Sequence, residues 1–210
     1  MFSVIFELRP KDAAHRDEYL AHAKDLKPLL ERIDGFIDNE RFAKRDHDGR
    51  MLSLSTWRDE KALVRWRTLE RHHHVQEKGR FEIFADYFLR VGEIISDSLV
   101  PRGEQLREQR FDETEVGAAK VVTLETASSE PLLTIGSMQG PIEVGIFDSI
   151  SNPGKVLILT AWRDDTARTG AAQAFSDARD VHRRTVRIVR EYGMFDRREA
   201  PQYYRAIERI

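Results

Sequence analysis

The sequence predicts an α+β fold in which two similar units follow one another along a chain of 210 residues. The stretch GRMLSLSTWRDE at 49–60 is nearly repeated as GKVLILTAWRDD at 154–165, and the matched residues keep a constant spacing of 105 positions. A constant spacing of this kind is typical of a duplicated unit. Within each unit, short segments rich in β-forming residues stand beside helical patterns, which is the composition of a sheet covered by helices.

The first unit begins with a strand and a long helix. Residues 4–8 are apolar and β-forming, and we expect a strand there. Apolar residues then recur at intervals of three and four positions over 12–34, which predicts one apolar helix face, and Gly35 provides the stop. Pro28 should kink or divide this helix, because its ring displaces an internal hydrogen bond.

The remainder of the first unit predicts a hairpin, a second helix and a last strand. The segments 36–45 and 51–57 are separated by turn-forming residues and read as a β-hairpin. A helix should follow over 59–78, with an aspartate as its N-cap and a glycine directly after its end. Residues 85–95 complete the order β-α-β-β-α-β, which defines the ferredoxin-like split unit.

The second unit repeats this order in a degenerate form. Its predicted strands are 120–125, the hairpin 142–150 with 156–162, and 182–190. Too few residues precede the hairpin for a full first helix, so we expect a single turn at 130–135. The helix after the hairpin should be short, because a glycine interrupts its pattern.

These elements predict a first domain at 1–98, a linker at 99–117 and a second domain at 118–210. The aromatic and charged tail at 190–204 is expected to be a strap that packs on the partner unit. A sheet with helices on one side leaves its other face bare, and burying that face against a second sheet is favourable by about 25 cal/mol per Å². The residues leave open whether the two copies pair within one chain or across a homodimer.

Composition excludes several classes of function. The formal net charge is −2 at pH 7, which gives no reason to expect nucleic acid or an anionic membrane as a partner. The absence of cysteine excludes disulfides, zinc–thiolate sites and thiol nucleophiles. No segment approaches the roughly 18 apolar residues of a membrane span, and the N-terminal residues lack a signal-peptide pattern, so a cytoplasmic protein is expected.

Several stretches together resemble a known family. They are GFIDNERF, GRMLSLSTWRDEKALVRW, HHHVQEKGR and FADYFLRV in the first unit, and IFDSISNPGKVLILTAWRD in the second. In these stretches the chain resembles the antibiotic biosynthesis monooxygenase family, as a tandem two-copy member. The resemblance implies antiparallel sheets that pack face to face as a dimeric α/β barrel, and a pocket between each sheet and its helices. Such pockets oxidise phenolic polyketides with O₂ and no metal or flavin, or bind and degrade haem.

The family pattern His-x-x-x-Gln-x-x-Gly-Arg matches His72, Gln76, Gly79 and Arg80. One of His72 and His73, together with Trp66, is expected to line the pocket. There it would orient or deprotonate a phenol, because the imidazole pKa is within reach of neutrality. His72 and Gln76 lie one turn apart on the expected helix and face the same way, and Trp66 and His73, seven residues apart, share a different face. The competing interpretation is a row of surface histidines on an amphipathic helix.

The tryptophans distinguish the two units. Trp57 and Trp162 end strands at matched positions, which favours packing over catalysis, whereas Trp66 has no counterpart because position 171 is alanine. The first unit is therefore the better candidate for an active pocket.

A metal site is not expected. Consecutive helical residues point about 100° apart, so His72, His73 and His74 cannot converge on one ion. The first strand lacks the asparagine on which the haem-degrading relatives rely, although haem binding through an axial histidine stays open.

The sequence thus predicts a cofactor-independent monooxygenase that oxidises a small aromatic or phenolic compound with O₂. Its expected catalytic residues are His72 and Trp66, and its expected substrate-binding residues are His73, Arg41 and Tyr87. A non-enzymatic small-molecule-binding or stress-response protein, and a haem-binding protein, are the alternatives on the same fold.

Overall fold

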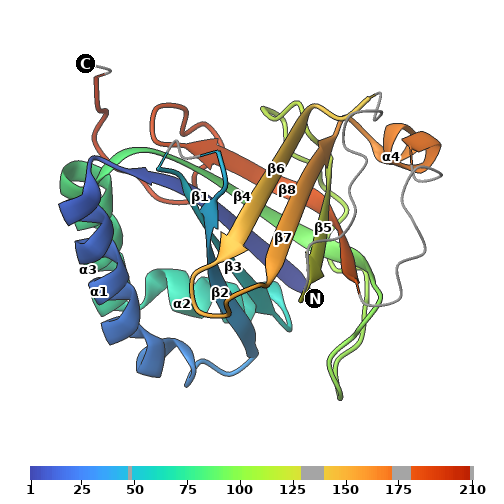
Figure 1. The fold of residues 1–210 in the computed structure, drawn as a ribbon, viewed down its shortest axis with the longest axis horizontal. Coiled ribbons are helices and arrows are strands. Elements are labelled where there is room, and N and C mark those ends of the chain that lie inside the picture. Colours follow the sequence, from blue (N-terminus) through green and yellow to red (C-terminus); the bar gives the residue numbers. More distant parts are fainter. Residues whose placement is uncertain (47–48, 129–139, 172–180, 209–210) are drawn as a thin grey trace.

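The computed structural model describes residues 1–46, 49–128, 140–171 and 181–208 (Figure 1). The strands are β1 Phe2–Pro10, β2 Phe36–Lys44, β3 Met51–Trp57, β4 Phe84–Asp97, β5 Val121–Ala127, β6 Glu143–Ser149, β7 Val156–Trp162 and β8 His182–Gly193. The helices are α1 Ala13–Leu30, α2 Glu60–Thr68, α3 Glu70–Lys78 and α4 Asp165–Ala171, with a π-helical turn η1 at Gly79–Ile83. The strands close into one barrel in the order β1-β3-β2-β6-β7-β5-β8-β4.

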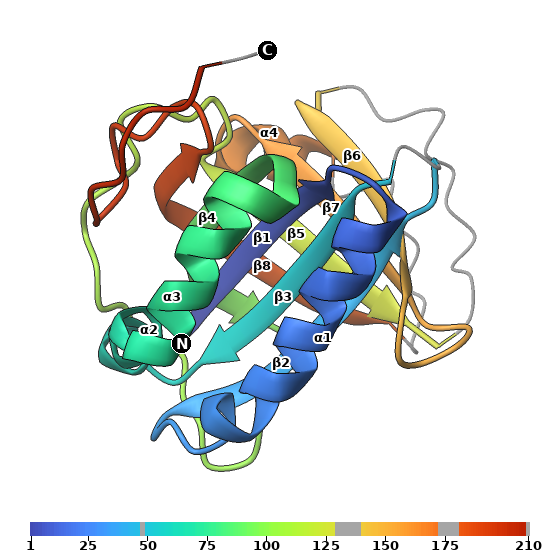
Figure 2. The same ribbon diagram turned by 90° about the vertical axis from the view of Figure 1, so that its left-hand side faces the viewer.

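The first half has the ferredoxin-like α+β arrangement that its sequence predicts. Strand β1 lies between β3 and β4, and β2 pairs with β3, all antiparallel. Helices α1, α2 and α3 cover the outer face of this sheet (Figure 2). Two apolar clusters fill the layer between helices and sheet, one around Trp57 and Leu63 and one around Tyr19 and Phe84.

Residues at the two ends of helix α1 explain where it begins and ends. The Asp12 carboxylate caps it by accepting a hydrogen bond from the His15 backbone N–H at 3.0 Å. The sequence suggested that Pro28 kinks or divides this helix. It does not divide it, because the proline lies in the last turn and the helix ends at Leu30. Gly35 then turns the chain into β2 with φ +89°.

The predicted helix over 59–78 is wrong as a single element. The Asp59 carboxylate caps α2 by accepting from the Ala62 N–H at 2.8 Å, as expected. The chain then leaves the helical conformation at Leu69, where φ is −60° and ψ is 121°, and α3 begins at the next residue. The break frees the Trp66 carbonyl from its regular helical partner, and this oxygen instead accepts from the Leu69 N–H at 3.3 Å and faces the His72 ring.

The second half orders its strands β6-β7-β5-β8, which corresponds to β2-β3-β1-β4 of the first half. Trp162 is fully buried like Trp57, and each indole N–H donates to a nearby hydroxyl, that of Thr123 at 2.7 Å and that of Ser55 at 2.9 Å. The segment 99–117 contains neither helix nor strand. The single turn expected at 130–135 lies outside the described residues.

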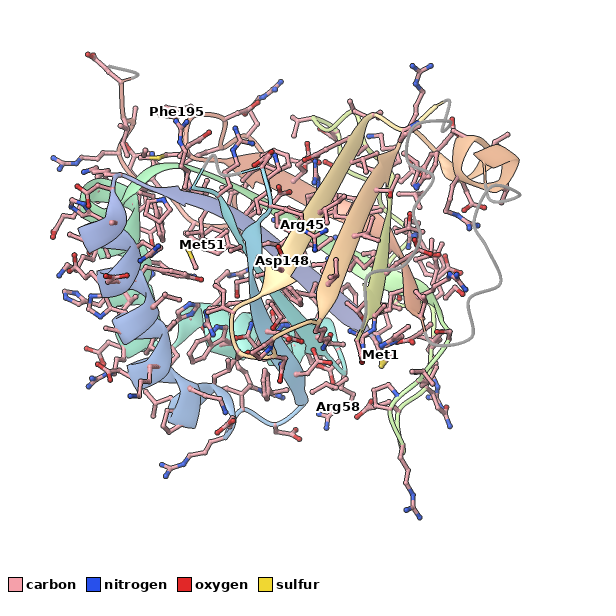
Figure 3. All side chains as sticks on the ribbon, viewed as in Figure 1. Met1, Arg45, Met51, Arg58, Asp148 and Phe195 are labelled. Atoms are coloured by element: carbon pink, nitrogen blue, oxygen red, sulfur yellow. The ribbon has the colours of Figure 1, made fainter. Side chains whose placement is uncertain are left out.

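The two sheets face each other and are also joined at both edges. At one seam β2 pairs with β6, with Ala43 opposite Asp148, and the Arg45 guanidinium donates to the Asp148 carboxylate at 2.5 and 3.0 Å (Figure 3). At the other seam β4 pairs with β8, with Glu93 opposite Arg187 and an ion pair of 2.9 Å between them. All eight strands contribute apolar side chains to one core inside the barrel.

A buried ionic cluster lies beside this core. The Arg90 guanidinium contacts three carboxylates, those of Glu7 at 3.0 Å, Glu143 at 2.9 Å and Glu191 at 3.2 Å. One buried cation cannot neutralise three carboxylates. Burial, reinforced by the charge of Glu143, accordingly raises the pKa of Glu7 from 4.5 to about 7.

We predict that Glu7 makes the folded state less stable as pH rises. The folded protein holds this proton more tightly than the unfolded chain, so the free energy of unfolding falls between about pH 4.5 and pH 7, by roughly 3 kcal/mol for this shift. Glu7→Gln should remove that part of the pH dependence, measured by urea unfolding from pH 4.5 to 8. An exposed substitution, Asp17→Asn, is the control. Parallel curves for native protein and Glu7→Gln would contradict the assignment.

Candidate active site

A cavity of about 200 Å³ lies between the helices of the first half and the outer face of its sheet. Apolar side chains make up much of its wall, among them Val4, Phe6, Leu63, Phe84, Leu89 and Val91. Concave, mostly apolar cavities with a few polar groups are the usual form of small-molecule sites. The polar groups therefore decide what this cavity can do.

Trp66 and His72 form a stacked pair in the cavity wall. Their ring centroids are 4.0 Å apart at an interplanar angle of 18°, and His72 Nδ1 lies 2.9 Å from the Trp66 carbonyl oxygen. Because a carbonyl only accepts, Nδ1 carries the proton, and Nε2 is left as an acceptor. No other residue in the described part of the chain bonds to Nε2.

The charge state of His72 differs from the expectation. Burial, reinforced by the neighbouring His73, lowers the pKa of its imidazole to about 4, although the hydrogen bond to the Trp66 carbonyl acts in the opposite direction. The pKa is thus not near neutrality, and the ring is neutral across the physiological range. His72 is suited to accept a hydrogen bond from a bound hydroxyl and is a weak base.

His73 lies outside the cavity. Its ring is exposed and stacks on Tyr204, with centroids 5.6 Å apart, and its Nδ1 is 3.2 Å from the Tyr204 hydroxyl. The expected pairing of Trp66 with His73 assumed a continuous helix. The break at Leu69 rotates α3 relative to α2 and brings His72 onto Trp66 instead.

The other two sequence-predicted residues, Arg41 and Tyr87, both line the cavity. Arg41 Nε donates to the Tyr19 hydroxyl at 3.4 Å, and its guanidinium lies 5.9 Å from the centre of that ring. The Tyr87 hydroxyl accepts from Arg197 at 2.7 Å and from Arg80 at 3.1 Å. With both acceptor sites occupied, this hydroxyl can donate its proton to a bound molecule.

Gly79 and Arg80 of the family pattern have structural roles that their spacing in the sequence did not reveal. A Cβ on Gly79 would lie 2.6 Å from the Phe84 ring, so only glycine fits there. Arg80 is almost fully buried and donates to the backbone carbonyls of Met194 at 2.7 Å and Arg205 at 3.0 Å. It therefore anchors the C-terminal tail over the first-half helices.

The tail supplies part of the cavity wall. From β8 and the residues after it, the lining includes Arg190, Tyr192, Arg197, Pro201, Gln202 and Tyr204. The sequence predicted a strap that packs on the partner unit, but it did not connect the strap with the pocket. The arginines at 183–190 alternate with valine and isoleucine, which is the ordinary pattern of a strand with one buried and one solvent-facing side, so they gave no signal of a pocket.

Two further side chains have unpaired polar atoms at the cavity. Among the described residues, the buried Gln76 Oε1 and Gln202 Oε1 have no hydrogen-bond partner. Buried polar atoms are usually paired. A water or a hydroxyl-bearing ligand in the cavity would satisfy these two acceptors.

We predict that His72 keeps its Nδ1–H tautomer and stays neutral down to about pH 4, because protonation would place a charge in a buried site. Heteronuclear NMR of the imidazole nitrogens across pH 3–8 measures both properties. The exposed His74, one residue beyond His73, provides an internal reference. Titration of His72 near pH 6.5, or a proton on Nε2, would contradict the geometry.

The described residues contain no cluster of three or more potential metal ligands. The helices in the same part of the chain are also too short or too polar to cross a membrane.

Comparison with known proteins identifies the family of this chain. The family described as antibiotic biosynthesis monooxygenase matches residues 1–78. The jasmonate monooxygenase of Pyricularia oryzae is 41% identical over 219 aligned positions, which cover 97% of this chain and 98% of that protein. The aldoxime dehydratase solved with butyraldoxime aligns with 89% of this chain and with 79% of the dehydratase chain, at a TM-score of 0.57 and 8% identity. This likeness concerns the fold alone. An anthrone oxidase-like protein covers 96% of both chains, with a TM-score of 0.40 and 11% identity. On the full-length similarity to the jasmonate monooxygenase, this chain belongs to the antibiotic biosynthesis monooxygenase family.

Proposed function

We propose that the chain is a cofactor-independent monooxygenase that oxidises a small aromatic or phenolic compound with O₂ in the first-half cavity. The observation that carries the proposal is the neutral His72, whose unpaired Nε2 belongs to a ring stacked on Trp66 in the wall of an apolar cavity. Membership of the monooxygenase family supports the reaction class.

The proposed reaction balances without an added reductant. A phenol with an unsubstituted para carbon and O₂ give a quinone and water. The para C–H and phenol O–H bonds break, a carbonyl forms at the para carbon, and the second oxygen atom leaves as water. The electron-rich substrate supplies all the electrons.

The protein's part is to bind and orient the substrate. His72 Nε2 would accept the substrate hydroxyl, while Trp66 and the other aromatic walls hold the ring. A base with a pKa of about 4 does not by itself remove a phenol proton. Negative charge that develops on the substrate oxygen would instead be stabilised by Arg41 and the Tyr87 hydroxyl, which both line the cavity.

Jasmonate is a second candidate substrate, because the relative that matches nearly the whole chain is named for it. Insertion of one oxygen atom into a saturated C–H bond reduces the second atom of O₂ to water and consumes two further electrons. A separate reductant would have to supply them.

We propose that the reaction needs no haem. The wall of the cavity is largely apolar, and the proposed chemistry is carried by the substrate, O₂ and protein side chains.

We also infer that the barrel consists of two copies of one unit and that only the first copy retains a site. Support comes from the seams, where matched residues of the two halves, Ala43 and Asp148, pair with each other. The matched burial of Trp57 and Trp162 supports it as well. Closure within the chain leaves no open sheet edge in the described strands, so we propose that one chain works alone and that a homodimer is not required.

Oxygen consumption tests the proposal. With a hydroxyanthrone, whose enol form is a phenol with an unsubstituted para carbon, the native protein should take up O₂. His72→Ala should lower kcat/KM about 100-fold or more, because the substrate hydroxyl loses its acceptor. Trp66→Ala should have a similar effect through loss of the stacked pair.

The matched control is His74→Ala, an exposed histidine on the same helix that does not line the cavity. Equal turnover in all three variants would remove the site assignment. A ligand retained through purification, without any O₂ uptake, would favour the small-molecule-binding alternative.

A further inference from the structure

Three arginines gather where the tail meets the first-half cavity. Arg67 comes from α2, Arg190 from β8 and Arg197 from the segment after β8, and all three line the cavity. Arg67 and Arg190 repel each other, and both act on the buried Tyr192 between them. The cluster therefore holds like charges together in a partly enclosed space.

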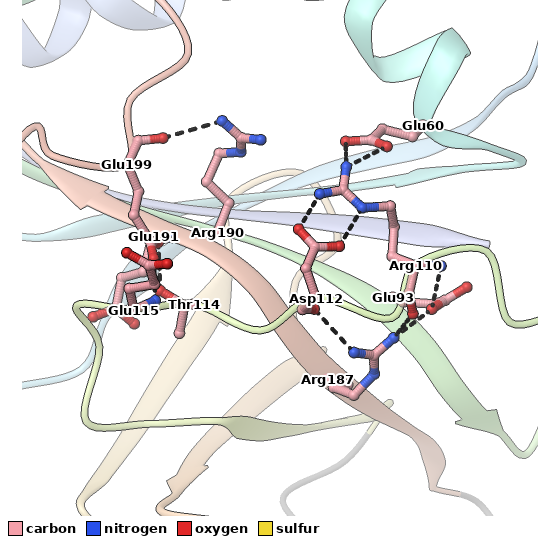
Figure 4. Close-up of polar contacts among 10 residues, drawn as sticks. All are labelled: Glu60, Glu93, Arg110, Asp112, Thr114, Glu115, Arg187, Arg190, Glu191 and Glu199. Carbon is pink, nitrogen blue, oxygen red and sulfur yellow. Dashed lines mark hydrogen bonds and ion pairs between the residues drawn. The ribbon is translucent and has the colours of Figure 1, made fainter.

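None of these three guanidinium groups has a carboxylate partner within the described chain. Arg190 donates to the backbone carbonyl of Glu199 at 3.2 Å (Figure 4), and Arg197 donates to the Tyr87 hydroxyl and to the Gln202 carbonyl. Arg67 makes no hydrogen bond to any described residue. A neutral oxygen acceptor leaves the positive charge uncompensated.

Several other arginines of the fold do have carboxylate partners. Arg187 pairs with Glu93 at 2.9 Å, and Arg90 contacts three carboxylates. The acidic side chain that does line the cavity, Glu60, is occupied by Arg110 of the linker, which donates to it at 2.7 and 2.8 Å (Figure 4). The cavity thus has an excess of positive charge at its tail end.

The neighbouring hydroxyl strengthens this arrangement. Burial raises the pKa of Tyr192 to about 12, so its hydroxyl stays protonated and adds a donor without adding negative charge. Burial also lowers the pKa of the Arg67 guanidinium, and Arg190 lowers it further, although Tyr192 and Glu60 act in the opposite direction. An anion bound here would relieve both the desolvation of Arg67 and its repulsion by Arg190.

We infer that Arg67, Arg190 and Arg197 form an anion subsite that binds a carboxylate of the substrate. The planar fork of a guanidinium matches the two oxygens of a carboxylate. This inference rests on the proposed function and narrows its substrate class to small apolar molecules that carry an acid group. The acid group lies against the arginines, and the apolar remainder lies along the cavity that His72 and Trp66 line.

Two of the three arginines come from the second half of the chain. The degenerate half therefore contributes to selection of the substrate, although the stacked pair belongs to the first half. Arg67, Arg190 and Arg197 are specificity-determining residues in this account, because they contact the acid group and not the reacting carbon.

Calorimetric titration under anaerobic conditions tests the subsite without turnover. The probes are two matched pairs, jasmonate with methyl jasmonate and a hydroxynaphthoate with its methyl ester. Each acid should bind the native protein about 10- to 100-fold more tightly than its ester, as expected for charge-assisted hydrogen bonds. Arg67→Gln should abolish this preference, and Arg67→Lys should retain part of it.

Arg71→Gln is the matched control, because Arg71 is exposed on α3 and does not line the cavity. Arg190→Gln provides a second test from the other half of the chain, and thermal unfolding verifies that each variant is folded. Equal affinity for acid and ester, no binding of either acid, or a full preference in folded Arg67→Gln would overturn the subsite. Retention of the preference without O₂ uptake would support the subsite and refute the proposed oxidation.

Discussion

Edge closure is the constraint on which the rest of this structure depends. A four-stranded sheet alone has two open edges and one bare face, and both favour aggregation. Here β2 and β4, the edges of the first sheet, pair with β6 and β8, and the bare faces share one core. One arrangement thus satisfies backbone hydrogen bonding and apolar burial together.

Closure also determines what surrounds the cavity. Because β8 must pair with β4, its outward-facing residues Arg190 and Tyr192 lie next to the helices that cover the first sheet. The chain leaves β8 on that side, where the buried Arg80 binds the backbone of the tail. In its described residues the second half contributes one short helix, α4, yet its last strand completes the cavity wall.

Much of the fold could be predicted from the sequence, because its signals are local. Caps such as Asp59, the hairpin turns and the apolar periodicity each depend on a few neighbouring residues, and all eight strands lie close to the segments expected. The position of His72 could not be predicted in the same way. It depends on Leu69, whose extended backbone separates α2 from α3. A leucine side chain gives no sign that a helix ends there. With Leu69 extended, Trp66 and His72 stack, and the His72 ring bonds the Trp66 carbonyl.

The arginines of the cavity could not be predicted for a different reason. Arg67, Arg190 and Arg197 lie on three elements, and only barrel closure brings them together. In the sequence each is one of many charged residues, and a charge without a partner becomes visible only when the positions of all neighbouring carboxylates are known.

Two kinds of polar group lie in different parts of the cavity, the neutral acceptor His72 in the apolar part and the arginines at the tail end. Desolvation removes the charge from His72, whereas the half-buried arginines at the tail end stay charged, because a guanidinium is protonated throughout the physiological range. A neutral acceptor in the apolar part can order a hydroxyl without attracting a counter-ion. The cations can hold an acid group without reaching the reacting carbon. The pH dependence of substrate binding above pH 5 should therefore arise from the ligand's own acid group and not from His72, since the imidazole does not change its charge in that range.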